Sequence, residues 1–500
     1  MNLTLEPAQV KSALAALKPH TESFIDGKFC PSSSGKTYPS LNPATGKPIV
    51  SLAACEVEDV NRAVKAARRA FDTGVWSRQK PADRKAVMLK FVELLEKHAM
   101  DIALLDALDA GKPLYDCVNI DVPDTIHCIH WHAELIDKMY DRASPAGPDN
   151  VAMIVREPIG VIGMLVPWNF PAQMLAWKIG PALSAGNSVI VKPAKQTSLS
   201  ALRIVELAAE AGIPEGVFNV ITGMGSVIGQ AICRHPDVDM VAFTGSTEVG
   251  RELLKYSAES NLKRVILELG GKCPQVVLED APDLDMVAAN AVNSAFWNMG
   301  ENCSSGSRLI VHRSIKDELL RKMMAIMKTL PLGDPLNPAT RVGPLIEKAH
   351  MDTVLKYIDI GKAEGARMLT GGKRVMQETG GNFVELTIFD EVTNKMKIAR
   401  EEIFGPVLSV IPVGSDEEAI RVANDTNYGL ACSLYTKDIS KAHRFARLLR
   451  NGTVSINCYS EGDLTTPFGG FKESGFFGRD KSIYAQEQYC ELKTIWMQLA

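Results

Sequence analysis

Short apolar runs alternate with helical segments along the middle of the chain. The expected strands cover 161–166, 188–191, 217–221, 240–243 and 264–267, and the helices that follow them begin at Pro171, Ser198, Gly225 and Ser246. Strands that are apolar throughout, rather than at every second residue, are typical of a parallel sheet with helices on both faces. Such a sheet binds ligands beyond the carboxyl ends of its strands.

Apolar residues at helical spacing also occur on both sides of this region. They predict helices at 56–71, 82–109, 123–139 and 286–297. From Phe24 to Val50, short apolar pieces alternate with Gly, Pro, Ser and Asn, which favours hairpins on the outside of a domain. The chain as a whole is therefore predicted to be an α/β protein.

Length, charge and cysteine usage exclude several classes of protein. The chain has 500 residues, 46% of them hydrophobic, which is enough for two or three domains. Its net charge of −4 does not favour nucleic acid as a partner. The apolar stretches are short and no export signal is seen, so a membrane partner is not expected. Ten cysteines without CxxC spacing favour a reducing compartment, and the predicted location is cytoplasmic.

One cysteine, Cys303, is the candidate nucleophile. It lies in the segment GENCSSGSR, residues 300–308, between the helix predicted at 286–297 and a short strand predicted at 308–312. A single cysteine is more often a small core residue. Here the polar neighbours Glu301, Asn302 and Ser304 would be costly to bury around an apolar thiol. A loop held by a rigid scaffold is a common position for a reactive side chain.

The ends of the five expected strands carry glycine, polar or charged residues. They include Trp168 and Asn169, Lys192 and Lys195, Gly225 and Gly229, Gly245 and Ser246, and Glu268. The backbone N–H groups at a helix that begins near Ser246 would suit an anion such as a pyrophosphate. The spacing GxGxxxG, from Gly223, differs from the dinucleotide fingerprint GxGxxG and is a weak signal alone.

Two apparent motifs are not interpreted as functional. Residues 35–37 end like a phosphate-binding loop, but Cys30 stands where that motif needs glycine. The second is the group His127, Cys128, His130 and His132. Only two of these histidines share a helical face and no further ligand cluster accompanies them, so partly buried, hydrogen-bonded histidines are expected rather than a metal site.

The chain resembles the aldehyde dehydrogenase superfamily over nearly its whole length. Six motifs in family order carry the resemblance: PWNFP at 167–171, FTGSTEVG at 243–250, LELGGK at 267–272, GENCSSGSR at 300–308, EEIFGP at 401–406 and PFGGFKESG at 467–475. The resemblance implies a Rossmann-like NAD(P)-binding domain, residues 1–139 and 159–271, and an α/β catalytic domain, residues 272–485. A small β flap for oligomerisation, as a dimer or tetramer, would consist of 140–158 and 486–500.

The resemblance implies oxidation of an aldehyde to a carboxylic acid. Cys303 would form a thiohemiacetal and then a thioester, with Glu268 as the base. Asn169 would donate to the oxyanion together with the Cys303 backbone, and Lys178 would relay protons unless it is simply a solvated helical lysine. A cofactor-free thiol hydrolase using Cys303 and Glu268 is the alternative class, although it would not explain the parallel sheet with anion-binding strand ends. An enzyme that forms acyl-CoA is a nearer alternative.

The cofactor implied by the resemblance is NAD or NADP. Its expected contacts are Trp168, Lys192, Lys195, Gly225, Gly229, Phe243, Gly245, Ser246, Glu402 and Phe404. A surface lysine at 192 and a purely structural turn near Gly405 are the alternatives for two of these. Lys195 stands where many NAD-using relatives have glutamate, and an ammonium group there favours a ribose 2′-phosphate. NADP is therefore expected to be accepted.

The predicted substrate is an aldehyde with a cationic tail. By resemblance, the substrate contacts are Phe170, Trp177, Asp124, Glu461 and Asp463. Acidic groups at the mouth of a tunnel suit a cation. The segment NCYSEGDLTTPFGG is similar to the branch of the family that oxidises γ-glutamylaminobutyraldehyde and other aminoaldehydes. A general aliphatic or semialdehyde dehydrogenase is the alternative.

Overall fold

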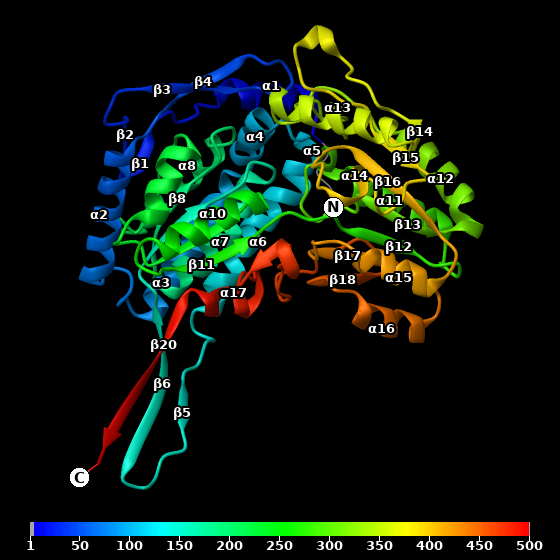
Figure 1. Ribbon diagram of the computed structural model, residues 1–500. Helices are drawn as coiled ribbons and strands as arrows, with labels where there is room; N and C mark the ends of the chain where they lie inside the picture. The colour runs from blue at the N-terminus through cyan, green and yellow to red at the C-terminus, as the bar shows by residue number, and fades with distance from the viewer. Residues whose placement is uncertain (1–4, 500) are drawn as a thin grey trace.

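The structure is a computed structural model that describes residues 5–499, and it is built on two mixed sheets with helices packed against them (Figure 1). The eight-stranded sheet has the order β19-β11-β10-β7-β8-β9-β1-β2, and the seven-stranded sheet has the order β14-β15-β16-β13-β12-β17-β18. A three-stranded sheet, β20-β6-β5, forms an arm, and β3 (Thr37–Leu41) pairs with β4 (Pro48–Ala53) in a hairpin. The predicted α/β class is confirmed.

Five parallel strands form the centre of the eight-stranded sheet. They are β7 (Val161–Leu165), β8 (Ser188–Lys192), β9 (Phe218–Val220), β10 (Met240–Thr244) and β11 (Arg264–Glu268). Nearly all of their side chains are buried, which explains why their sequences do not alternate between apolar and polar. Antiparallel strands lie at the two edges: β1 (Ser23–Ile25) and β2 (Lys28–Cys30) at one, and β19 (Gly475–Phe476) at the other.

The helices that connect these strands begin where the sequence predicts. They are α7 (Pro171–Ala185), α8 (Leu199–Ala211), the π-helical turn η2 (Gly225–Gly229) with α9 (Gln230–Arg234), and α10 (Thr247–Ala258). The start of α7 is fixed by Pro171 and by Asp106 Oδ2, which accepts a hydrogen bond from the Ala172 N–H at 3.2 Å. α7 ends at Gly186, whose φ of 99° is left-handed.

The amino-terminal helices differ from the prediction at several points. They are α1 (Pro7–Ala16), α2 (Val57–Thr73), α3 (Pro81–Lys97), α4 (Ala99–Ala110), α5 (Leu114–Asp116), η1 (Cys117–Asp121) and α6 (Val122–Leu135). The single helix predicted at 82–109 is wrong, because His98, with φ −109° and ψ 20°, separates α3 from α4. The His98 ring bonds the Asp101 carboxyl and the Arg203 guanidinium. Apolar residues continue on both sides of this break, so spacing alone did not reveal it.

The seven-stranded sheet contains the strand that follows Cys303. Its strands are β12 (Pro274–Val277), β13 (Arg308–His312), β14 (Arg367–Thr370), β15 (Thr387–Asp390), β16 (Val407–Val413), β17 (Ala431–Tyr435) and β18 (Thr453–Ile456). All neighbours are parallel except β14 and β15. The associated helices are α11 (Leu284–Phe296), α12 (Arg313–Met327), α13 (Lys348–Ala363), α14 (Lys397–Arg400), α15 (Asp416–Asn424) and α16 (Ile439–Leu448).

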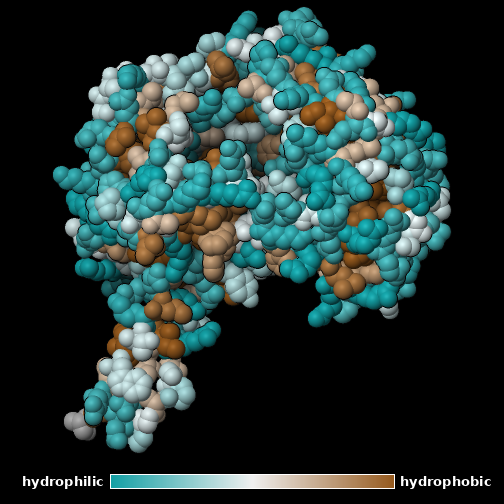
Figure 2. All heavy atoms as spheres, viewed as in Figure 1, coloured by the Kyte–Doolittle hydropathy of each residue, from teal (hydrophilic) through white to brown (hydrophobic). Residues whose placement is uncertain are grey.

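The arm extends away from the two large sheets (Figure 1). It consists of β5 (Arg142–Ser144), β6 (Asn150–Pro158) and β20 (Cys490–Gln498), and β20 pairs with β6 along its full length. The side chains of Leu492 and Trp496 on β20 are 69% and 62% exposed, and Figure 2 shows hydrophobic residues gathered where the arm leaves the body. No helix within residues 5–499 is both long and apolar enough to span a bilayer.

Candidate active site

Cys303 lies in an irregular connection between α11 and β13. A short turn, η3 (Trp297–Gly300), precedes it, and in this turn Asn298 and Met299 have left-handed φ values of 51° and 57°. A Cβ on Gly300 would lie 2.3 Å from the Gly405 carbonyl oxygen, so only glycine fits there. Strained backbone at a nucleophile is common, because the surrounding structure imposes one geometry.

A cavity of about 230 Å³ opens on one side of Cys303. It is lined by Pro167, Trp168, Asn169, Met174, Thr244, Gly245, Ser246, Leu269, Gly270, Cys303, Glu402 and Phe404. Most of these residues follow the carboxyl ends of β7, β10 and β11. Cys303, Glu402 and Phe404 lie in loops that lead into strands of the seven-stranded sheet. β7 is where the strand order reverses, and parallel sheets bind ligands at such a point.

Two hydrogen-bond donors are available beside the Cys303 thiol. The Asn169 side-chain nitrogen donates one proton to the Glu301 carbonyl at 3.0 Å, which leaves its second proton free. The Asn298 amide bonds the carbonyls of both Asn169 and Glu301 and fixes this arrangement. Within the described chain, the Cys303 backbone N–H makes no hydrogen bond. Both free donors can therefore stabilise an oxyanion formed at Cys303.

The Cys303 thiol is partly buried, and its surroundings disfavour the thiolate. Burial raises its pKa well above 9, and the charges of Glu461, Glu402 and Glu268 raise it further. Both effects favour the protonated thiol over the thiolate. A base or a change in the local charges is needed before it attacks a carbonyl.

Glu268, at the end of β11, is buried and lies in a recess formed by two glycines. A Cβ at Gly469 or at Gly478 would be 2.7 or 2.8 Å from its Oε1. Burial and the nearby Asp480 carboxylate raise the pKa of Glu268 well above its ordinary value, against the opposite effects of Lys178 and Arg479. Glu268 is near enough for its charge to act on Cys303, although it does not line the cavity.

Lys178 is not the solvated lysine that was the alternative interpretation. Its side chain is 1% exposed, and its Nζ lies 2.9 and 2.7 Å from the two carboxylate oxygens of Asp480. Asp480 in turn raises the pKa of Glu268. The buried Lys178–Asp480 ion pair therefore acts through its charges on Glu268, which the sequence separation did not reveal.

The cavity residues fit a dinucleotide. Ser246 caps α10, its Oγ accepting from the Val249 N–H at 3.3 Å, so the free N–H groups of this 12-residue helix face the strand ends. Glu402 is held by the Gly271 N–H at 2.8 Å, and a Cβ at Gly270 would lie 2.2 Å from its Oε2. Burial raises the pKa of Glu402 to about 7. These groups offer an anion site and a ribose acceptor.

Two aromatic residues predicted to contact the cofactor lie together in this cavity. The rings of Trp168 and Phe404 are 5.2 Å apart and nearly perpendicular. Phe404 has a φ of 56°, and its carbonyl accepts a hydrogen bond from His350 Nε2 at 2.7 Å. His350 was not singled out in the sequence, because only the fold brings α13 to this position.

The other predicted cofactor residues lie at the remaining strand ends. Lys192 is buried rather than on the surface, and burial followed by the charge of Lys195 lowers its pKa to about 8. Its Nζ is 3.8 Å from where a Cβ on Gly225 would lie. Gly229 packs closely on β7. Lys195 Nζ lies 3.7 Å from Glu347 Oε2, an ion pair not foreseen.

Phe243 does not line the cavity. Its ring lies against Gly245, where an added Cβ would be 2.4 Å from the ring. The side chain therefore supports the strand end through packing, and its neighbours Thr244 and Gly245 line the cavity.

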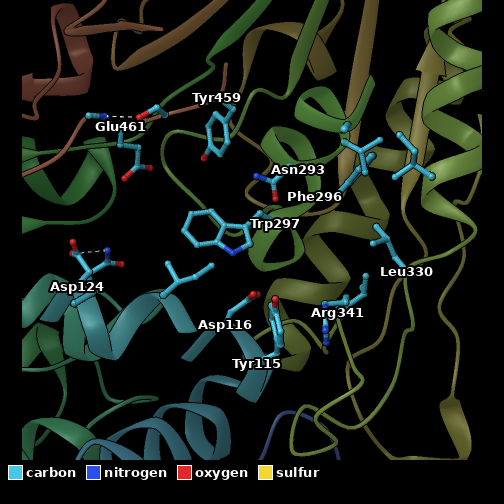
Figure 3. A pocket seen from close by; sticks show the side chains of 18 residues that line it. Tyr115, Asp116, Asp124, Asn293, Phe296, Trp297, Leu330, Arg341, Tyr459 and Glu461 are labelled. Carbon is cyan, nitrogen blue, oxygen red and sulfur yellow. Dashed lines mark hydrogen bonds between the residues drawn. The ribbon is translucent and has the colours of Figure 1, made fainter. Parts of the chain in front are cut away.

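A second cavity, of about 500 Å³, lies beyond the nucleophile loop (Figure 3). Figure 3 shows Trp297 in its centre, with Asp124 and Glu461 to one side and Asp116, Tyr115 and Arg341 to the other. Burial raises the pKa of Asp116 to about 7. Asp116, Arg341, Trp297 and Tyr459 were not predicted, because they come from four separate segments.

Four of the predicted substrate residues either line this second cavity or pack behind the residues that line it. Asp124 and Glu461 line the cavity, and Asp124 Oδ2 accepts hydrogen bonds from Trp177 Nε1 at 2.9 Å and from Gln173. Phe170 is buried behind Trp297, with their ring centroids 5.1 Å apart.

Asp463 lies outside the cavity. It is exposed, and its carboxylate accepts from the Thr465 N–H and hydroxyl, so it closes a turn.

The histidine-rich helix also differs from its interpretation. His127 and His130 are exposed, and His132 is buried with its pKa lowered to about 3 by burial. Within the described part of the chain, no three His, Cys, Asp or Glu side chains are grouped to hold a metal. The segment that resembles a P-loop continues into β3 rather than into a helix.

Comparison with known proteins gives a consistent result. The sequence profile of the aldehyde dehydrogenase family matches residues 29–495. The chain is 53% identical over 497 residues to an aminoacetaldehyde dehydrogenase of Pseudomonas aeruginosa, covering 99% of both chains. It is 46% identical over 476 residues to the NADP/NAD-dependent aldehyde dehydrogenase PuuC of Escherichia coli, covering 95% of both.

Solved structures show the same fold. An indole-3-acetaldehyde dehydrogenase in complex with NAD+ has a TM-score of 0.97 at 50% identity, with 99% of this chain and 100% of that chain covered. A γ-glutamyl-γ-aminobutyraldehyde dehydrogenase from Burkholderia cenocepacia also has a TM-score of 0.97, at 48% identity and the same coverage.

Proposed function

The chain belongs to the aldehyde dehydrogenase family and is an NAD(P)-dependent enzyme, and from this we propose that its substrate is an aminoaldehyde whose cationic tail lies in the cavity of Figure 3. The observation that carries this proposal is the presence of Asp116, Asp124 and Glu461 in that one cavity. Carboxylates in a partly enclosed site attract an ammonium group. A relative at 53% identity that is named an aminoacetaldehyde dehydrogenase supports the same substrate class.

In the proposed mechanism, the Cys303 thiol first gives up its proton to solvent water, and the sulfur of the resulting thiolate adds to the aldehyde carbonyl. The resulting oxyanion accepts hydrogen bonds from the Asn169 amide and the Cys303 N–H, and losing one such donor costs about 3 kcal/mol. When bound, NAD(P) supplies the hydride acceptor. Glu268 turns from its glycine recess, takes the proton of the attacking water and so releases the acid from the thioester. Lys178 and Asp480 hold Glu268 in a charged, buried setting.

The test of the substrate compares two aldehydes in the wild-type protein and two variants. With 4-aminobutyraldehyde we expect Asp124→Asn to raise KM about 10-fold, which corresponds to about 1.4 kcal/mol of lost attraction. With hexanal we expect little change. Asp463→Asn is the matched control, because that carboxylate lies outside the cavity. Equal effects of Asp124→Asn on both aldehydes would favour the general aliphatic dehydrogenase instead.

NADP is proposed as an accepted cofactor. Lys195 offers a positive charge near Lys192, which supports binding of a 2′-phosphate. The ion pair of Lys195 with Glu347 partly offsets that charge. Use of both cofactors is consistent with a relative named NADP/NAD-dependent.

Three further features remain proposals. We propose a division into residues 1–139 with 159–271, 272–485, and 140–158 with 486–500. The three larger sheets support it, with one exception: β19 (Gly475–Phe476), near the end of the predicted catalytic segment, joins the eight-stranded sheet. We propose a homo-oligomer joined through the arm, whose β20 is an edge strand with exposed apolar side chains. The cytoplasmic location is proposed from the cysteine usage, and all ten cysteines are free thiols.

A further inference from the structure

Glu461 belongs to the substrate cavity and to the nucleophile loop at the same time. Its side chain lines the cavity on the same side of Trp297 as Asp124 (Figure 3). Its Oε1 accepts a hydrogen bond from the hydroxyl of Ser304, the residue after Cys303. The direct hydrogen-bond partner of this carboxylate is therefore a hydroxyl rather than a cation.

Tyr459 provides a second connection between the same two regions. Its hydroxyl is 2.8 Å from Asn302 Nδ2 and 2.9 Å from Ser304 Oγ. Asn302 and Ser304 are the two neighbours of Cys303 in the chain. The wall of the substrate cavity is therefore hydrogen-bonded to both sides of the nucleophile.

The acidic groups with the largest effect on Cys303 are carboxyl groups. Besides burial, the groups that raise its pKa are Glu461, Glu402, Cys273 and Glu268, and Glu461 has the largest effect among them. Negative groups close to a thiol disfavour its loss of a proton.

Glu461 itself also faces charged groups in the cavity. Burial raises its pKa, the Asp124 carboxylate raises it further, and Ser304, Lys481 and Lys112 lower it. The Lys481 ammonium is occupied by the carbonyls of Glu461 and Gly462, at 2.8 and 3.4 Å. A ligand cation beside Glu461 would therefore form the direct ion pair with its carboxylate.

We propose that Glu461 couples the binding of a cationic substrate tail to the activation of Cys303. An ammonium group bound in the cavity neutralises the negative charge of the Glu461 carboxylate, and this charge opposes formation of the thiolate. This rests on the proposed aminoaldehyde specificity and goes beyond it: the tail is needed for reactivity as well as for affinity. Glu461 acts through Cys303 and is a positioning and specificity-determining residue. A neutral aldehyde brings no positive charge to pair with the Glu461 carboxylate.

The coupling can be measured without turnover. The rate at which iodoacetamide modifies the peptide that contains Cys303 is followed by mass spectrometry as a function of pH, without cofactor. Adding 1,4-diaminobutane to the wild-type protein should lower the midpoint of this profile by about one pH unit, which is the scale expected for one nearby charge. The neutral 1,4-butanediol should leave the midpoint unchanged.

Two variants complete the experiment. Glu461→Gln should have the lower midpoint without diamine and show no further shift when diamine is added. Asp463→Asn, two residues along the same loop but outside the cavity, should behave as wild type. In turnover, Glu461→Gln should raise kcat/KM for hexanal and lower it for 4-aminobutyraldehyde.

The possible failures separate the two proposals. If the diamine competes with hexanal, and so binds, but does not move the midpoint, the coupling is overturned while the aminoaldehyde specificity stands. A wild-type midpoint in Glu461→Gln overturns the coupling as well. If the diamine does not compete at all, both proposals fail together. The wild-type measurements do not depend on how well the variant folds.

Discussion

The carboxyl group of Glu268 is buried between glycine residues, and its chemistry depends on the pH at which it loses its proton. Gly469 and Gly478 have no side chains, and this leaves the space that the Glu268 carboxyl group occupies. The Asp480 carboxylate opposes ionisation of Glu268. A general base acts only as the carboxylate. Since the pKa of Glu268 is raised, the base form is lost as the pH falls through a range well above that of an ordinary glutamate.

We expect Glu268→Gln to slow release of the acid by roughly 10²- to 10⁴-fold, the range typical of a lost general base. A rapid burst of NAD(P)H equal to the number of active sites should precede this slow phase. The wild-type kcat should rise with pH through the raised pKa of Glu268, and the variant should lack this rise. Stopped-flow absorbance at 340 nm over a pH series checks this. A variant with the wild-type pH profile would exclude Glu268 as the base.

A second prediction for single residues concerns cofactor choice. We expect Lys195→Glu to lower the ratio of kcat/KM for NADP over NAD at least about 10-fold, because a carboxylate repels the 2′-phosphate. Glu347→Gln should raise the same ratio several-fold, about 1 kcal/mol, by freeing the Lys195 ammonium. Steady-state kinetics with both dinucleotides measures both ratios. In the double variant Lys195→Gln, Glu347→Gln, the effect of Glu347 should vanish; if it persists, the ion pair is not its cause.

At the scale of elements, one buried ion pair joins α7 to the segment before α17 (Ser482–Gln488). Lys178 lies on α7, Asp480 lies 302 residues later, and both side chains are 1% exposed. Two opposite charges can be buried together because their attraction offsets the free energy of removing them from water, whereas burying one charge alone costs several kcal/mol of stability. The pair thereby holds the segment with Gly478 and Arg479 against the end of β11, where Glu268 lies.

We expect Asp480→Asn to lower the free energy of unfolding by about 3–5 kcal/mol, because it leaves the Lys178 ammonium buried without its partner. The double variant Lys178→Met, Asp480→Leu should recover much of this loss, since it buries no charge. Urea denaturation followed by circular dichroism measures both. Equal losses in the single and double variants would show that packing, and not charge, holds these segments together.

At the scale of the whole molecule, the arm has little to fold against within one chain. Leu492 and Trp496 lie on the same face of β20, because alternate residues of a strand point the same way. Large apolar side chains exposed together mark a surface that another molecule covers. The arm extends away from the two large sheets, so it can contact another chain without disturbing their packing (Figure 1).

We expect the pair of substitutions Leu492→Arg and Trp496→Arg to reduce the mass in solution to that of one chain, because in a symmetric dimer each charge enters the interface twice. Sedimentation velocity at several concentrations measures this. Lys493→Ala, on the other face of β20, should keep the wild-type mass. An assembly that survives both arginines would place the interface elsewhere.

The local order of residues was enough to predict most elements of the eight-stranded sheet and to single out a candidate nucleophile. Buried parallel strands need uninterrupted apolar runs, and Cys303 stands among polar residues that a core would not accept. The break at His98 was missed, because an apolar stripe continues through it. The family motifs, rather than spacing, supplied the expected pairing of Glu268 with Cys303.

The sequence by itself determined the α/β class, the family and the identity of the candidate nucleophile, because these follow from short-range patterns and from motifs of adjacent residues. Only the tertiary structure decided which distant charges meet: Lys178 with Asp480, Lys195 with Glu347, and Glu461 with the residue beside Cys303. Electrostatic effects depend on distance and burial. Neither distance nor burial is set by separation along the chain. Asp463 and Glu461 are two residues apart in the sequence, and only the folded structure places Glu461 in the cavity and Asp463 outside it.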